Sequence, residues 1–140
     1  VIEQNENHIF FRVHPEVDRY FSEEITEEKY ASAAASGIPV RIQTVLSEGA
    51  GLTIGGYRIW IEQGRVKTDR SRVFRNIKGP ALTASAPGSR SRHELDIFVE
   101  PNLIEIFIDG GESVISHVVY DLGNTLTGQA LRLFVGGDGR

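Results

Sequence analysis

The sequence contains no cysteine, which excludes disulfide bonds, a thiolate nucleophile and cysteine-ligated zinc, and leaves the redox compartment open. It also contains no methionine and begins with Val1, so we expect a processed product or a piece excised from a longer polypeptide. Its apolar runs span only a handful of residues, far fewer than the ~20 that cross a bilayer. No charged and then apolar signal segment opens the chain. These absences predict no membrane partner and no disulfide scaffold.

The length and composition are those of one ordinary folded domain. The chain has 140 residues, of which 40% are hydrophobic and 24% are charged. A chain of this length buries roughly two-thirds of the surface that its unfolded form exposes, which is enough for one core. This composition also differs from that of disordered chains. We predict a single domain over residues 1–140.

Charge is distributed unevenly along the chain. The net charge is −4, but residues 65–92, here called the basic segment, carry eight basic groups and one acidic group. Its candidate anion-facing residues are Arg65, Lys67, Arg70 and Arg72. Two interpretations stay open: the segment faces an anionic ligand or acidic partner, or antiparallel strands place it beside acidic segments and the charges pair. The acidic isoelectric point and the lack of an aromatic RNA-binding motif argue against nucleic acid.

Apolar and polar residues alternate with a period of two over most of the chain. This pattern predicts strands at 38–46 and 57–62, a two-residue turn at Gln63-Gly64 and a returning strand at 65–69. In each strand the apolar side chains are expected to face a core. The polar side chains, including Arg41, are expected to face water.

The clearest strand unit lies at 93–120. Two alternating runs are separated there by Pro101-Asn102, and Gly110-Gly111 after the second run allows the positive φ of a tight hairpin. A further strand is expected at 131–135. A brief strand at 82–84 interrupts a Gly, Pro and Ser-rich loop.

One stretch, residues 22–35, fits a short helix capped by Ser22 better than a strand. No helix is long enough to connect parallel strands. Many short strands with one apolar face, joined at glycine-marked turns, predict an all-β fold. We expect an antiparallel two-sheet β-sandwich, jelly-roll or concanavalin A-like, with at most one short helix near the N-terminus.

The motifs of catalysis are missing. Glycoside hydrolysis needs two carboxyl groups roughly 5–10 Å apart, and the candidate pairs alternate with apolar strand residues or lie on a helix face. These pairs are Glu23/Glu24, Glu27/Glu28, Asp96/Glu100 and Glu105/Asp109. We interpret them as solvated surface. The histidines His8, His14, His93 and His117 lack metal-ligand spacing, and the chain has no HExxH, GxSxG or phosphate loop. The sequence predicts no catalytic residue, no metal and no cofactor.

Three aromatic residues, Trp60, Phe98 and Phe107, fall on the polar side of predicted strands. If Phe98 and Phe107 occupy neighbouring strands, they form an apolar patch on a face expected to be wet. Such a patch docks another domain or chain, or stacks on a sugar. Alternatively, a segment of the same domain covers it, or the aliphatic face is not the inward one.

Three segments carry a family resemblance. Residues 52–72 begin LTIG and end GRVKTDRSR, residues 95–112 read LDIFVEPNLIEIFIDGGE, and residues 116–120 read SHVVY. In order and spacing they resemble the motifs IGY…G…VDRSRSG, LRIFVDRSSIEIFVNDGE and TSRVYP of the C-terminal β-sandwich of glycoside hydrolase family 32. This family contains invertases, sucrose-6-phosphate hydrolases, levanases and inulinases. Residues 100–103 depart from the family's Asp-Arg-Ser-Ser turn, and the first 36 residues match none of its motifs.

The resemblance implies a parent enzyme with a five-bladed β-propeller followed by this sandwich. Such a parent hydrolyses β-fructofuranosidic bonds of sucrose, sucrose-6-phosphate or fructans, with its catalytic carboxylates in propeller motifs of the types NDPNG, RDP and EC. None of these motifs occurs here, so no catalytic residue is transferred and this chain alone is not expected to be an enzyme. Its implied role is to stabilise the propeller.

The resemblance also implies the partners and the compartment. The first partner is the parent's own propeller, and in some members the sandwich mediates a homodimer or helps hold an oligosaccharide. The compartment would be the cytoplasm for a sucrose-6-phosphate hydrolase and the exterior for a levanase or inulinase. Two other functions remain open from the residues: a stand-alone lectin-like carbohydrate-binding module stacking sugars on Trp60, and an adhesion or oligomerisation domain that uses an exposed sheet.

Overall fold

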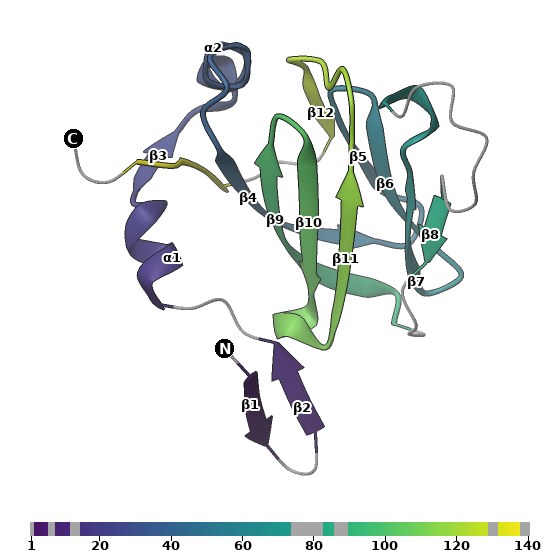
Figure 1. Ribbon diagram of the computed structural model, residues 1–140. Helices are drawn as coiled ribbons and strands as arrows, with labels where there is room; N and C mark the ends of the chain where they lie inside the picture. Colours follow the sequence, from purple (N-terminus) through teal and green to yellow (C-terminus); the bar gives the residue numbers. More distant parts are fainter. Residues whose placement is uncertain are drawn as a thin grey trace.

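Two antiparallel sheets face each other and form a β-sandwich (Figure 1). The computed structural model describes residues 2–5, 8–11, 15–73, 83–85, 90–128 and 132–137, with side chains described in 16–73, 90–128 and 132–137. The predicted all-β sandwich is confirmed. Within the described part of the chain, the helices are too short or too polar to cross a membrane.

The six-stranded sheet has the order β11-β10-β9-β4-β13-β3. Its strands are β11 (Ser113–Val118), β10 (Leu103–Ile108), β9 (Arg92–Glu100), β4 (Val40–Ser47), β13 (Arg132–Val135) and β3 (Glu23–Ile25). The five-stranded sheet has the order β12-β5-β6-β7-β8. Its strands are β12 (Leu126–Gly128), β5 (Gly51–Ile54), β6 (Tyr57–Glu62), β7 (Arg65–Asp69) and β8 (Thr83–Ser85).

Beside the two large sheets, the described residues form six further elements. The strands β1 (Ile2–Asn5) and β2 (His8–Phe11) pair as a separate hairpin beside the short 3₁₀ turn η2 (Asp109–Gly111) (Figure 1). The helices α1 (Pro15–Tyr20) and α2 (Glu27–Ala35) lie toward the β3 side of the six-stranded sheet, and a second 3₁₀ turn, η1 (Ser71–Val73), follows β7.

The core lies between the sheets, where the alternating pattern placed it. In β6 and β9 the inward side chains are at most a few per cent exposed; they are Tyr57, Ile59, Ile61, Leu95, Ile97 and Val99. The outward residues alternate with them as expected of strands with one buried face. Ile38 differs from the prediction, because it precedes β4 and is exposed.

The turns predicted at glycines are present, and one of them is longer than expected. Gln63 and Gly64 both have positive φ, 54° and 73°, as the two-residue hairpin between β6 and β7 requires. The expected tight hairpin at Gly110-Gly111 is a longer connection, because Ile108 pairs with Ser113 and η2 fills the space between them. The strand expected at 82–84 is β8, and most of the loop predicted around it lies outside the described residues.

The N-terminal region differs from the helix predicted at 22–35. Residues Glu23–Ile25 form β3, and helix α2 begins at Glu27 with Thr26, not Ser22, at its N-cap. The strand forms because β13 offers an unpaired edge, on which Ile25 lies opposite Leu133. The sequence predicts at most one short helix here, and the structure has a further one, α1, with Pro15 in its first position.

Candidate functional site

Phe98 and Phe107 lie together on the outer face of the six-stranded sheet. In the β9–β10 register Phe98 is opposite Glu105, and Phe107 is opposite Asp96, so the two rings are diagonal neighbours. Their centroids are 5.7 Å apart and their planes meet at 82°, an edge-to-face arrangement. Both side chains are half-buried. The structure therefore brings together two of the three aromatic residues selected from the sequence.

The C-terminal end of α1 and the residue after it cover one side of this aromatic pair. Phe21 is buried and packs edge-on against Phe98 at 5.5 Å, and Tyr20 packs against Phe21 at 5.0 Å. A segment of the same chain thus shields Phe98, which was one of the open interpretations. On the other side Phe107 is paired across β10 and β11 with Val114, which is 39% exposed. Phe107 and Val114 are called the open patch below.

Arg41 holds this covering segment in place. It lies on the outer face as predicted, but it is only 7% exposed, so the expectation that it faces water is wrong. Its Nε and Nη2 donate to the two carboxylate oxygens of Asp96 at 2.8 and 2.6 Å, and its Nη1 donates to Asp18 of α1. The guanidinium also lies 5.1 Å from the Phe98 ring centroid. The hydrogen bonds to Asp96, and to a smaller extent the one to Asp18, raise the pKa of Arg41 above its ordinary value.

Trp60 lies apart from the aromatic pair, on the outer face of the five-stranded sheet. One face of its ring contacts the guanidinium of Arg58, whose central carbon is 4.9 Å from the ring centroid. Its indole N–H donates to Glu62 at 2.9 Å. The bond from Trp60, followed by the charge of Lys67, lowers the pKa of Glu62. Trp60 is half-exposed and belongs to a row of charged residues, not to a hydrophobic patch.

The basic segment is partly paired with acidic neighbours. Lys67 lies opposite Trp60 and bonds Glu62 at 3.4 Å. Arg90 bonds Glu112 at 2.8 Å and Asp109 at 3.2 Å. Arg70 donates to the carbonyl of Val118 at 2.7 Å. Among the other residues selected from the sequence, Arg65 and Arg72 are exposed. For Lys67 and Arg90 these contacts fit the charge-pairing interpretation.

Several of the described carboxylates form structural hydrogen bonds. Bonds from Arg132 lower the pKa of Glu24, and the backbone N–H of Ser71 lowers the pKa of Asp69. Asp96 binds Arg41 as described above. Glu23, Glu27, Glu28 and Glu100 are exposed. The general acid of a glycosidase needs a raised pKa, and each carboxyl shift resolved in the described residues is downward.

Two histidines form polar links between the sheets, which the sequence did not indicate. His93 of β9 contacts Asp109 through Nδ1 at 2.6 Å and the Gly64 carbonyl in the β6–β7 turn through Nε2 at 2.8 Å. His117 of β11 contacts the hydroxyl of Tyr57 in β6 at 2.8 Å. Burial lowers the pKa of His117. Both therefore act as cross-sheet hydrogen-bonding groups. The side chains of His8 and His14 lie outside the described residues.

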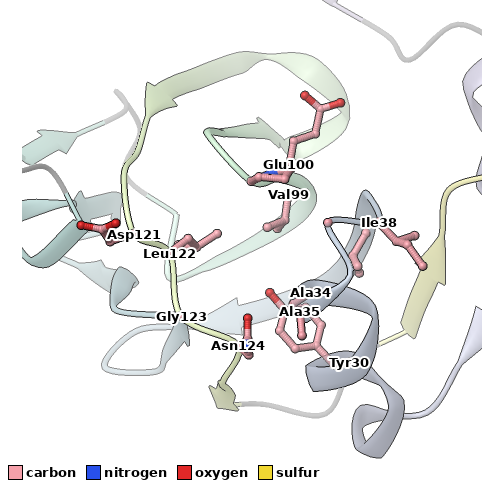
Figure 2. A pocket seen from close by; sticks show the side chains of 13 residues that line it. Tyr30, Ala34, Ala35, Ile38, Val99, Glu100, Asp121, Leu122, Gly123 and Asn124 are labelled. Atoms are coloured by element: carbon pink, nitrogen blue, oxygen red, sulfur yellow. The ribbon is translucent and has the colours of Figure 1, made fainter.

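A pocket of about 270 Å³ opens at the end of the sandwich near α2 and the β9–β10 turn (Figure 2). Three segments converge on it: the C-terminal half of α2 with the residues after it, the end of β9 with the turn that follows, and the loop 121–124. The sequence did not predict this pocket. It depends on three segments that are distant in the chain, and none of them carries a binding motif.

Comparison with known proteins identifies a family and a similar solved structure. The sequence matches the family described as "Glycosyl hydrolases family 32 C terminal" over residues 16–139, which includes much of the region that matched no motif. The structure is similar to that of sucrose-6-phosphate hydrolase from Lactobacillus gasseri, with a TM-score of 0.66 and 16% sequence identity. The similarity covers 98% of this chain and 33% of that one. No curated protein sequence matches significantly.

Proposed function

Because this chain belongs to the glycosyl hydrolase family 32 C-terminal domain family, we propose that it is the non-catalytic β-sandwich of a β-fructofuranosidase-type hydrolase. In this role it stabilises a catalytic β-propeller that lies elsewhere in the parent polypeptide. The parent cleaves β-fructofuranosidic bonds of sucrose, sucrose-6-phosphate or fructans. Its compartment follows from that substrate, since sucrose-6-phosphate is cleaved inside the cell and fructans outside it.

The state of the carboxylates carries the non-catalytic part of this proposal. Asp96 neutralises Arg41, Glu62 binds Lys67 and Trp60, and each resolved carboxyl shift in the described residues favours the ionised form. A retaining glycosidase needs one carboxyl that stays protonated near neutral pH and a second about 5 Å away. Asp96 and Glu62 thus hold neighbouring side chains in place, which is a structural task.

The open patch supports a domain-packing role. Phe107 and Val114 continue the aromatic row beyond the part that Phe21 covers. An apolar pair on the outer face of a sheet loses solvent contact when another domain packs there. We propose the catalytic propeller as the occupant of this patch. A homodimer through the same face is the second outcome that the experiments below distinguish.

An activity assay tests the non-catalytic assignment. The purified 140-residue chain is incubated with sucrose and with sucrose-6-phosphate, and the release of reducing sugar is measured against a mock purification. We expect no turnover above that control. Turnover that persists through two orthogonal purification steps would refute the assignment. Sequencing the coding region upstream of Val1 gives a second test, since the proposal requires an Asn-Asp-Pro-type propeller motif there.

A binding assay tests the packing role. The catalytic propeller encoded upstream is expressed separately, and its thermal midpoint is measured with this chain added in trans. We expect the chain to raise that midpoint. Phe107→Asp is expected to remove the effect, whereas Arg65→Asp on the other sheet should retain it. A propeller midpoint that is equal with and without the chain would contradict the proposal. Sedimentation equilibrium of the chain alone reports the homodimer separately.

A further inference from the structure

The ring of His93 lies between two groups that accept hydrogen bonds and have no proton to donate. His93 is 2% exposed, and its Nε2 is 2.8 Å from the backbone carbonyl of Gly64 in the β6–β7 turn. Its Nδ1 is 2.6 Å from Oδ2 of Asp109 in η2. A carbonyl oxygen and an ionised carboxylate are both acceptors only. Two hydrogen bonds here require a proton on each ring nitrogen, and only the imidazolium has two N–H groups.

The contacts of Asp109 place the shared proton on the ring and not on the carboxyl. Its Oδ1 accepts the backbone N–H of Glu94 at 2.9 Å, and its Oδ2 lies 3.2 Å from Nη1 of Arg90. Both oxygens thus act as acceptors, as those of an ionised carboxylate do. The backbone of Asp109 is left-handed, with φ of 52°, which is uncommon for a residue other than glycine. The side-chain bonds hold the carboxylate against the ring in spite of that backbone.

The charges around the ring also favour the imidazolium. Among the described residues, three carboxylates and two guanidiniums lie on the elements packed against this end of β9: Asp109, Glu112, Glu48, Arg90 and Arg65. Glu48 accepts the N–H of Gly64 at 2.9 Å, so it polarises the turn whose carbonyl faces His93. On β9 itself, Arg92 and Glu94 are exposed on the opposite face. The excess of negative charge stabilises a buried cation.

From these contacts we propose that His93 is a pH-sensitive latch between the two sheets. With two N–H groups it ties η2, on the six-stranded sheet, to the β6–β7 turn of the five-stranded sheet. When the second proton is lost, one ring nitrogen becomes an acceptor that faces another acceptor. A bond to a carboxylate is stronger than a bond to a carbonyl. The ring therefore keeps its bond to Asp109 and releases Gly64.

The latch lies at the end of the two strands that carry the open patch. Phe107 pairs with Val114, Ile108 pairs with Ser113, and η2 connects the strands beyond that pair. Strand β2, whose side chains lie outside the described residues, also packs beside η2. The proton on His93 thus sets how firmly this end of the sandwich is joined across the sheets. The latch is a property of the chain alone, so it can fail while the proposed function stands.

Nuclear magnetic resonance of the 140-residue chain, labelled with ¹³C and ¹⁵N, tests the protonation state directly. The ¹⁵N shift distinguishes a ring nitrogen that carries a proton from one that does not. At about pH 7.5, where an ordinary histidine is mostly neutral, we expect two N–H groups on His93. His117 is the internal comparison, because burial lowers its pKa and it should show one. Raising the pH further should remove the second proton of His93 and shift the carbonyl carbon of Gly64 in the same step.

Asp109→Asn tests the group that holds the proton. Asparagine tolerates the left-handed backbone of this position, and its amide can donate to Nδ1, so His93 no longer needs two N–H groups. We expect one N–H group on His93 in this variant at about pH 7.5. Glu112→Gln is the matched control, since it neutralises a neighbouring carboxylate that bonds Arg90. It should keep both N–H groups on His93.

Urea unfolding measures the consequence for stability. The folded chain binds this proton more firmly than the unfolded chain, so the stabilisation from His93 is present at low pH and is lost as the pH rises. The parent chain should therefore have a higher urea midpoint than His93→Gln, and this difference should shrink between about pH 6 and 9. His117 titrates in both proteins, so the difference isolates His93.

Four outcomes would overturn the latch. A single N–H group on His93 in the parent chain at about pH 7.5 would show a neutral ring. Two N–H groups in Asp109→Asn would mean that the carboxylate does not hold the proton. A difference in urea midpoint from His93→Gln that is constant or grows with pH would separate the charge from the link. If a variant does not fold, the parent titration still decides, because a Gly64 carbonyl that is unshifted when the proton leaves rejects the release.

Discussion

Arg41→Met tests whether one buried guanidinium fastens the N-terminal segment to the sheet. The substitution keeps most of the aliphatic stem and removes the three hydrogen bonds to Asp96 and Asp18. Breaking a buried ion pair by removing one partner costs roughly 3–5 kcal/mol, because the other charge is left uncompensated. Asp96 keeps 23% of its side-chain exposure, so water partly compensates it. We expect the free energy of unfolding to fall by about 2–3 kcal/mol.

The partners of Arg41 should not contribute equally. The Asp18 side chain is 61% exposed, so Asp18→Asn should cost only about 0.5 kcal/mol, as surface pairs do. Arg132→Met is the matched control: Arg132 lies on the same sheet and pairs with Glu24, but both side chains are more than half exposed. It should also cost about 0.5 kcal/mol.

Urea unfolding followed by Trp60 fluorescence and far-UV circular dichroism measures these differences. For a domain of this size a loss of 2–3 kcal/mol lowers the urea midpoint by about 1 M. In a double-mutant cycle, Arg41→Met and Asp96→Asn together should cost less than the sum of the single changes. The reasoning is refuted if Arg41→Met costs no more than Arg132→Met, or if the two changes at positions 41 and 96 are additive.

The remaining predictions concern a close backbone contact and a buried histidine. At Gly55 φ is +53°, and a Cβ there would overlap the Gly123 carbonyl, so Gly55→Ala should lower the free energy of unfolding by at least about 3 kcal/mol in a urea titration. Gly49 is the control, because its φ is +82° and a Cβ there has no neighbour within 4 Å. Gly49→Ala should therefore cost only about 1 kcal/mol, from its φ alone. Equal costs for the two alanines would contradict the contact. Burial lowers the pKa of His117 from 6.5, so the unfolded chain binds the proton more readily and stability is lost as the pH falls below about 6.5. His117→Gln should keep a polar side chain near Tyr57, and its urea midpoint should fall less than that of the parent chain between about pH 7.5 and 5.5. Equal falls in the two proteins would show that His117 does not cause the loss of stability.

Local patterns in the sequence predicted most of the strands and the family. Side chains on a strand alternate between two faces, so the period of two already separated core residues such as Ile97 from outward residues such as Phe98. The Gln63-Gly64 turn was equally readable, because its positive φ values are a local requirement. Motif order along the chain indicated the family that the match over residues 16–139 shows.

The tertiary structure decided what each outward residue does. Arg41 was expected in water, and it is buried because α1, whose position no local pattern predicts, lies across it. Residues 23–25 became a strand because β13 exposes an edge there, which overrides helix propensity.

The polar links and the pocket also depend on contacts between distant segments. His93 and His117 bond across the sheets, and the Tyr30 hydroxyl faces a loop about ninety residues away in sequence. Periodicity specifies which face of its own strand or helix a side chain occupies. What meets that face is a property of the assembled chain, because burial and hydrogen bonding are set by neighbours in space.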